Sequence, residues 1–187
     1  MEQVLRDKPI SIYIPYTLLV MALASAFIVA INKVELKPFE VEYPEASFIA
    51  PGFDLPSLTG GNYKLSDYQG KVVFINFWAT WCGTCKVEMA SMEKLYQTFK
   101  KDGFEMLTIS VDKDMSLIKP FMEKYNLTFP VLLDPESKLA KGKYKTTGVP
   151  ETFVVNQEGI IVYKAIGPDD WSTPEMMQAF SQLIKGT

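Results

Sequence analysis

Residues 72–85 read VVFINFWATWCGTC, an apolar run followed by a segment that contains two cysteines. Val72 to Trp78 form an almost continuous apolar run, which is typical of a strand buried on both faces. Cys82 and Cys85 follow, and beyond them the large apolar residues recur at helical spacing. The sequence therefore predicts a cysteine pair at the point where a buried strand ends and a helix begins.

This position gives the two cysteines a chemical role. The free backbone N–H groups and the dipole at a helix N-terminus stabilise an anion, so they favour a thiolate there. We expect Cys82 to be the exposed nucleophile, and Cys85 to be the more buried thiol that resolves a mixed disulfide. Half a zinc site and an inert structural disulfide are the alternatives. Zinc usually requires four Cys or His ligands, and so short a loop gains little from a cross-link.

Composition excludes several classes of protein. The chain has 187 residues, a formal net charge of −3 and no histidine, so a Ser–His or Cys–His hydrolase is excluded. Acidic and basic residues are well mixed, which gives no indication of a nucleic-acid partner. We expect no cofactor and no metal. Because there is no nucleotide-binding motif, electrons for the cysteine pair would come from another protein.

The N-terminal part of the chain predicts a membrane anchor. No residue from Pro9 to Asn32 is charged. As a helix, residues 10–31 would be about 33 Å long, enough for a hydrocarbon core of about 30 Å. A cleaved signal peptide is the alternative, but its apolar region would be shorter. We therefore expect a cytoplasmic tail at 1–9, a transmembrane anchor at 10–31 in contact with lipid, a linker at 32–50 and a folded domain at 51–187.

The folded domain has an α/β pattern. Besides residues 72–78, strands are expected at 106–111, 131–133, 152–155 and 160–164, the last two forming a hairpin around Gly159. Helices are expected after Cys85 and at 116–125 and 137–144. Two more are expected from capping signals, a short one starting at Ser66 and a last one capped by Ser172.

The cysteine segment also carries a family resemblance. Residues 76–85, NFWATWCGTC, resemble the active-site segment of the TlpA/ResA branch of the thioredoxin superfamily. Residues 65–73 (LSDYQGKVV), 148–153 (GVPETF) and 167–171 (GPDDW) resemble further segments of that branch, so the resemblance covers residues 46–187. It implies a thioredoxin-like fold, a central mixed sheet flanked by helices, which here would follow one N-terminal transmembrane helix.

The resemblance also implies the composition of the active site. Cys82 and Cys85 would be the catalytic residues and would form a redox-active disulfide. The Val149–Pro150 peptide bond would be cis and would pack against Cys82. The residues expected to frame the site are Trp81, Gly83, Thr84, Val149 and Pro150.

The chain departs from family patterns at three positions, one of which is Ala90, where this branch commonly has a proline. Thr84 stands where many thioredoxins have proline, and Asn76 stands where cytosolic thioredoxin has a buried aspartate. An amide cannot relay a proton, so that role requires another group or water. Glu151 and Glu88 are the acidic candidates for proton transfer. Glu151 would serve Cys85, whereas a solvated helix flank is the simpler interpretation of Glu88.

The function implied is that of a single-pass thiol–disulfide oxidoreductase of the inner or plasma membrane. Its domain would lie on the extracytoplasmic (periplasmic) side and reduce disulfides of protein partners, for example in cytochrome c maturation, with electrons from a membrane protein. A thiol peroxidase of related fold is one alternative, but such centres place a Pro and a Thr or Ser shortly before the cysteine. A non-enzymatic redox-sensing tether is the other.

We predict that the intact chain stays in the membrane, because the uncharged run is long enough to span it. After cell fractionation, alkaline carbonate should leave the full-length protein in the membrane pellet. Release of a shortened soluble protein would instead indicate a cleaved signal peptide.

Overall fold

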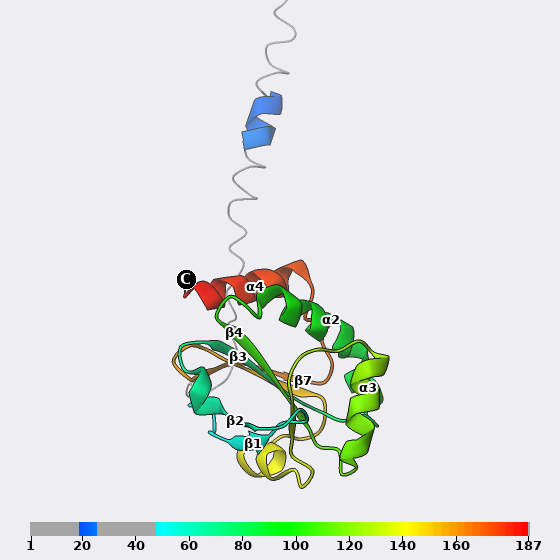
Figure 1. Cartoon of the computed structure of the whole chain (residues 1–187). Coiled ribbons are helices and arrows are strands. Elements are labelled where there is room, and N and C mark those ends of the chain that lie inside the picture. Colours follow the sequence, from blue (N-terminus) through cyan, green and yellow to red (C-terminus); the bar gives the residue numbers. More distant parts are fainter. Residues whose placement is uncertain (1–18, 26–47, 187) are drawn as a thin grey trace, which may run out of the picture. The chain divides into compact units, whose positions relative to one another are not determined.

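The structure is a computed structural model that describes residues 19–25 and 48–186. Residues 19–25 are helical and fall within the predicted anchor. The rest of that anchor, the tail and most of the linker lie outside the described residues. Within the described part, no helix combines the length and apolar character needed to cross a bilayer. The chain divides into two units, residues 1–37 and residues 38–187, and the domain in the second unit carries the cysteine pair (Figure 1).

A five-stranded mixed sheet forms the centre of the domain, with the strand order β5-β4-β3-β6-β7. The strands are β3 (Val72–Trp78), β4 (Phe104–Ser110), β5 (Val131–Leu133), β6 (Glu151–Val155) and β7 (Ile161–Ile166). β3 runs parallel to β4 and antiparallel to β6, so the mixed sheet implied by the resemblance is confirmed. A separate hairpin pairs β1 (Asp54–Pro56) with β2 (Asn62–Lys64).

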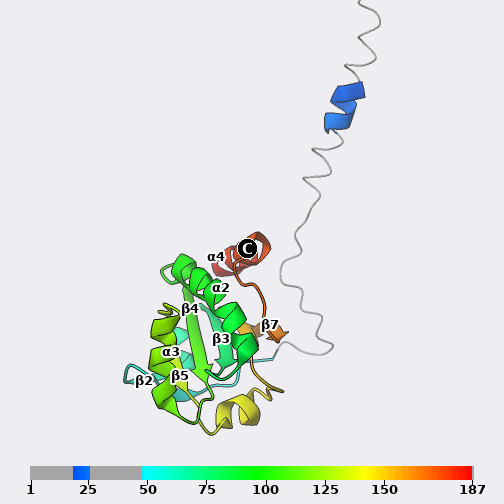
Figure 2. The same cartoon turned by 90° about the vertical axis from the view of Figure 1, so that its right-hand side faces the viewer.

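Helices cover the sheet. The α-helices are α2 (Gly83–Phe99), α3 (Ile118–Lys124) and α4 (Pro174–Lys185), and Figures 1 and 2 show α2 and α4 side by side. Shorter turns are η2 (Leu65–Tyr68), η3 (Met115–Leu117) and η4 (Lys138–Lys143), of which η4 is a π-helix. The strands and helices lie close to those expected, and the short helix expected at 137–144 is the π-helix η4.

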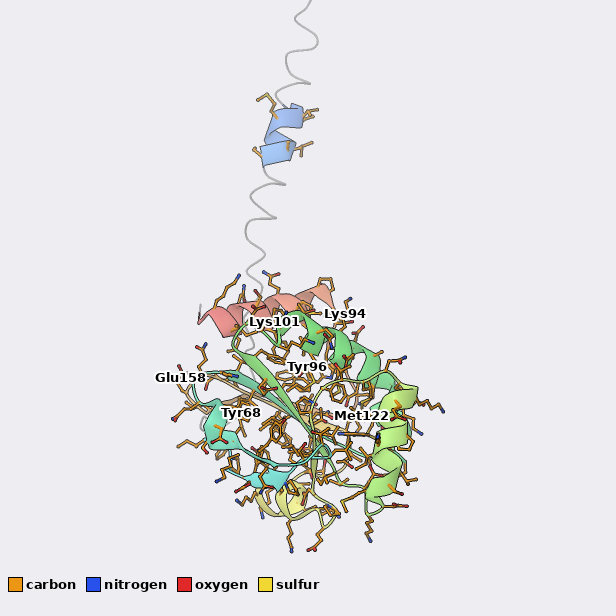
Figure 3. All side chains as sticks on the ribbon, in the orientation of Figure 1. Tyr68, Lys94, Tyr96, Lys101, Met122 and Glu158 are labelled. Carbon is orange, nitrogen blue, oxygen red and sulfur yellow. A yellow bond between two sulfur atoms is a disulfide. The ribbon has the colours of Figure 1, made fainter. Side chains whose placement is uncertain are left out.

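β3 separates two apolar clusters, and every one of its seven residues is buried. Phe74 and Trp78 pack with residues of α2, α3 and α4, whereas Ile75 and Phe77 pack with residues around η4. Successive side chains of a strand point to opposite faces, which explains the continuous apolar run of β3. Figure 3 shows this packed interior, whereas Lys94 and Lys101 on the outside are exposed.

Two predicted caps are wrong. Thr173, not Ser172, caps α4, because its side chain accepts a hydrogen bond from the Met176 N–H. Ser172 instead donates to Asp170 through both its backbone N–H and its hydroxyl. The short helix predicted from Ser66 is the 3-10 turn η2, which has no side-chain cap.

Candidate active site

The cysteine pair lies at the N-terminus of α2, where the sequence places it. Cys82 is the N-cap residue and forms a disulfide with Cys85, whose backbone N–H donates to Cys82 Sγ at 3.0 Å. Cys85 is fully buried, and Cys82 is only 5% exposed. The expectation that Cys82 would be exposed is therefore wrong for this oxidised state, in which the carbonyl oxygen of Val149 lies 3.5 Å from its sulfur.

The predicted framing residues surround the disulfide. The Val149–Pro150 peptide bond is cis, as the resemblance implied. The Thr84 hydroxyl lies 3.4 Å from Cys82 Sγ and donates to it, because a disulfide sulfur carries no hydrogen. Gly83 begins α2, and Trp81, which is 67% exposed, precedes the pair. Both a hydroxyl donor and a backbone carbonyl therefore lie within 3.5 Å of the Cys82 sulfur.

Asp112, which sequence reasoning missed, holds the turn that precedes Cys82. Its buried carboxylate accepts from the Thr80 N–H at 2.9 Å and from the Thr80 hydroxyl at 2.7 Å. The Ser110 hydroxyl donates to it at 2.8 Å. One signal was available, since Asp112 directly follows the predicted strand 106–111, and the carboxyl ends of parallel strands commonly carry functional groups.

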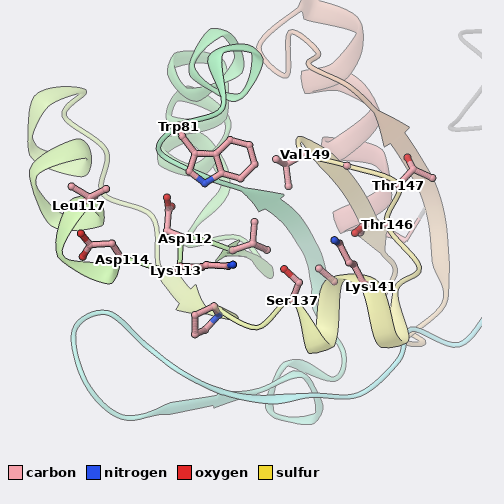
Figure 4. Close-up of a pocket in the computed structure, with 14 residues that line it drawn as sticks. Trp81, Asp112, Lys113, Asp114, Leu117, Ser137, Lys141, Thr146, Thr147 and Val149 are labelled. Atoms are coloured by element: carbon pink, nitrogen blue, oxygen red, sulfur yellow. The ribbon is translucent and has the colours of Figure 1, made fainter.

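A cavity of about 630 Å³ is lined by Trp81, which precedes Cys82, and by Val149, whose carbonyl oxygen lies near the Cys82 sulfur. In Figure 4, Trp81 and Val149 form one side of it, and Ser137 and Lys141 lie on the other. Asp112 also lines the cavity and lies below Trp81 in this view. The lining of the cavity combines apolar side chains such as Val111 and Leu117 with charged ones such as Lys113 and Lys141. No cluster of three or more Cys, Asp or Glu placed to hold a metal occurs in residues 19–25 or 48–186.

Glu88 is fully buried, so its interpretation as a solvated helix flank is wrong. The loop around Asp169 and Trp171 covers this part of α2. Glu88 Oε2 accepts from the Trp171 indole N–H at 3.1 Å and from the Asp169 N–H at 3.4 Å, and Oε1 accepts from Asn76 Nδ2 at 2.9 Å. Burial raises the pKa of Glu88, and these three donors offset part of that rise.

Asn76 connects Glu88 to the sheet. Its Nδ2 donates to Glu88 and also to the Thr152 hydroxyl at 2.8 Å, whereas its buried Oδ1 has no hydrogen-bond partner. Glu88 is therefore a titratable group hydrogen-bonded to Asn76, the residue that stands where cytosolic thioredoxin has a buried aspartate.

Glu151 is also fully buried, but it does not lie near Glu88. Thr152 pairs with Asn76 across β6 and β3, and Glu151 pairs with Phe77. Adjacent residues of a strand point to opposite faces, so Thr152 lies on the α2 face and Glu151 on the η4 face. The structure therefore separates the two acidic candidates by the thickness of the sheet.

The mixed sheet, the C-x-x-C pair at a helix N-terminus and the cis-proline define the chain as a thioredoxin-fold protein. The profile of the AhpC/TSA family matches residues 48–164. "Thiol-disulfide oxidoreductase ResA" of Bacillus cereus is 36% identical over 135 residues, which cover 72% of this chain and 76% of that protein. ResA of Bacillus subtilis is 37% identical over 136 residues, covering 73% and 74%.

A solved structure of a related protein has the same fold. The thiol:disulfide interchange protein of the thioredoxin family from Chlorobium tepidum superimposes with a TM-score of 0.65 at 25% identity, covering 76% of this chain and 99% of that one. The chain belongs to the AhpC/TSA family and, in it, to the ResA/TlpA-like thioredoxin branch. It is a thiol–disulfide oxidoreductase.

We predict that Cys82 reacts before Cys85 in the reduced protein, because the N-terminus of α2 favours its thiolate. The test is limited alkylation at about pH 6, well below the pKa of about 8.5 of a free thiol, followed by peptide mass spectrometry. Preferential labelling of Cys85 would reverse the assignment of nucleophile and resolving thiol.

We predict that Glu88→Gln weakens the pH dependence of stability. Because the folded-state pKa of Glu88 is raised, its contribution to the free energy of unfolding falls as pH rises from the ordinary value of 4.5 through the raised one. Gln does not ionise, so urea unfolding from about pH 4 to about pH 8 should show a shallower decline. Burial also raises the pKa of Glu105, which both proteins retain, so some decline remains. Equal slopes would contradict the prediction.

Proposed function

We propose that the protein is a membrane-tethered reductase of protein disulfides, with Cys82 as nucleophile and Cys85 as resolving thiol. The observation that carries the proposal is the Cys82–Cys85 disulfide at the N-terminus of α2, beside a cavity and opposite the Val149 carbonyl. The Cys85 N–H that donates to Cys82 Sγ would equally stabilise a thiolate after the disulfide is opened.

The reaction begins from the reduced pair. The Cys82 thiolate attacks one sulfur of the substrate disulfide, forms a mixed disulfide and releases the first substrate thiolate. Cys85 then loses its proton and attacks Cys82 Sγ, which releases the second substrate thiolate and leaves the Cys82–Cys85 disulfide. Two electrons pass from the cysteine pair to the substrate, and an electron-donor protein must return the pair to the dithiol state.

Glu88 is the better placed of the two candidates to take the Cys85 proton. Cys85 is fully buried, so its deprotonation requires a group inside the domain. Glu88 lies one turn further along the same helix, and its raised pKa brings it closer to the range of a thiol. Glu151 is less suited to this role, because it points to the other face of the sheet.

The proposal also covers location. Residues 10–31 would anchor the chain in the inner or plasma membrane, and residues 51–187 would act on the periplasmic side. The uncharged run from Pro9 to Asn32 supports this. The tether from Lys33 to Ala50 would span at most about 60 Å, so partners would lie near the membrane surface. An oxidising compartment traps dithiols, so a membrane protein would have to supply electrons. Opening the disulfides of apocytochromes during cytochrome c maturation would be one such task.

The two rival functions receive less support. Peroxidase centres use an arginine, and residues 48–187 contain none. The residues before Cys82, Thr80 and Trp81, also lack the Pro and Thr or Ser arrangement of those centres. A redox-sensing tether would use the same disulfide without turnover. Catalytic reduction of insulin with dithiothreitol as electron source would separate an enzyme from such a sensor.

We predict that Cys85→Ser traps the substrate, because the mixed disulfide on Cys82 can no longer be resolved. Non-reducing electrophoresis and mass spectrometry of the adducts should identify extracytoplasmic or membrane proteins. Cys82→Ser is the matched control and should give no adducts and only the background insulin reduction by dithiothreitol. Adducts made only of cytosolic proteins would contradict the proposed topology.

A further inference from the structure

Glu151 and Lys164 form a largely buried ion pair next to residues 147–150, which we call the cis-proline loop. Glu151 directly follows this loop and is fully buried, and the Lys164 side chain is only 18% exposed. The Lys164 ammonium pairs with Glu151 Oε1 and lies 5.1 Å from the centre of the Phe153 ring. The pair thereby joins β6 to β7 on the face of the sheet that carries Phe153.

The second oxygen of Glu151 holds the cis-proline loop. Its Oε2 accepts from the Thr147 N–H at 2.8 Å and from the Thr147 hydroxyl at 3.3 Å. At the other end of the loop, the Gly167 N–H donates to the Pro150 carbonyl at 3.0 Å. One carboxylate therefore connects the first residue of the loop to a cation on β7, and the last residue of the loop is tied to the end of the same strand.

The loop is part of the surface that a substrate would meet. Val149 contributes the carbonyl that lies 3.5 Å from Cys82 Sγ. Thr147, Gly148 and Val149 line the cavity beside Trp81 (Figure 4). Pro150 has no N–H, so the loop offers carbonyl groups and the open edge of its backbone to a partner. A shift of Thr147 would therefore move the atoms that face an incoming disulfide.

We propose that Glu151 and Lys164 are positioning residues, which fix the cis-proline loop for a protein disulfide substrate; this rests on the proposed reductase function. Proton transfer from Cys85 to Glu151 would need the carboxylate on the α2 face, but the register with β3 turns it to the opposite face. If the ion pair acts only by positioning the loop, single and double substitutions should have different effects. Loss of either partner leaves a buried charge without compensation, whereas loss of both leaves none.

The test compares Glu151→Gln, Lys164→Met and the double variant with the wild type, measuring KM and kcat for insulin reduction with dithiothreitol. Each single variant should raise KM by about tenfold, the effect of about 1.4 kcal/mol of lost binding, with the loss falling on KM rather than on kcat. The double variant should recover most of that loss, because its buried side chains are both neutral.

Lys138→Met is the matched control. It removes a lysine from the Lys138–Glu136 ion pair, whose side chains are 79% and 68% exposed, and should leave KM at the wild-type value. Circular dichroism checks that each variant folds, and Lys164→Met with the double variant still tests recovery if Glu151→Gln does not fold.

Two results would overturn the proposal. If kcat falls equally in Glu151→Gln and in the double variant while Lys164→Met is unaffected, the result would assign proton transfer to Glu151. A fall in thermal stability with an unchanged KM would show that the pair supports only the fold. If the wild type itself fails to reduce insulin, the proposed function is what fails.

Discussion

The pairing of β3 with β4 on one side and β6 on the other is the interaction on which the active site depends. Trp78, the last residue of β3, lies opposite Ser110, the last residue of β4, and Phe77 lies opposite Glu151, the first residue of β6. Three segments with little sequence proximity therefore reach the same edge of the sheet. They are the turn into the cysteine pair, the turn that carries Asp112, and the cis-proline loop. A slip of one residue would reverse every side chain of a strand and separate these groups.

The same register places two buried carboxylates in different surroundings. Glu88 meets three neutral N–H donors, and its pKa is raised because those donors do not fully replace water. Glu151 meets the ammonium group of Lys164 and two donors from Thr147. The first arrangement contains no charged partner, whereas in the second the removal of either group by substitution would leave a buried charge without compensation.

The features that the sequence predicted well depend on local signals. The apolar run of β3, the two cysteines at the start of α2 and the glycine-containing turn between β6 and β7 are each encoded by consecutive residues. The cis peptide bond at Pro150 came from a family resemblance rather than from a physical argument. Membrane anchoring stays a prediction, because the anchor falls mostly outside the described residues. The individual catalytic roles also stay predictions.

The features that the sequence missed depend on distant partners. The burial of Glu88 requires Trp171, which lies 83 positions further along the chain. Thr173 rather than Ser172 caps α4, because Ser172 donates its hydroxyl and backbone N–H to the Asp170 carboxylate. Asp112 acts on Thr80, 32 positions away. Periodicity and turn signals do not contain such pairings, which exist only once the sheet has assembled.

The exposure of Trp81 has a spectroscopic consequence. The chain has three tryptophans; Trp78 and Trp171 are fully buried on the α2 side of the sheet, whereas Trp81 is largely in solvent and adjoins Cys82. Disulfides quench the excited state of a nearby indole by accepting an electron, and a dithiol does so less effectively. Indole emission should therefore brighten when the Cys82–Cys85 bond opens, and the part due to Trp81 should lie to the red of the emission of the two interior indoles. The protein thus carries its own fluorescent indicator of oxidation state.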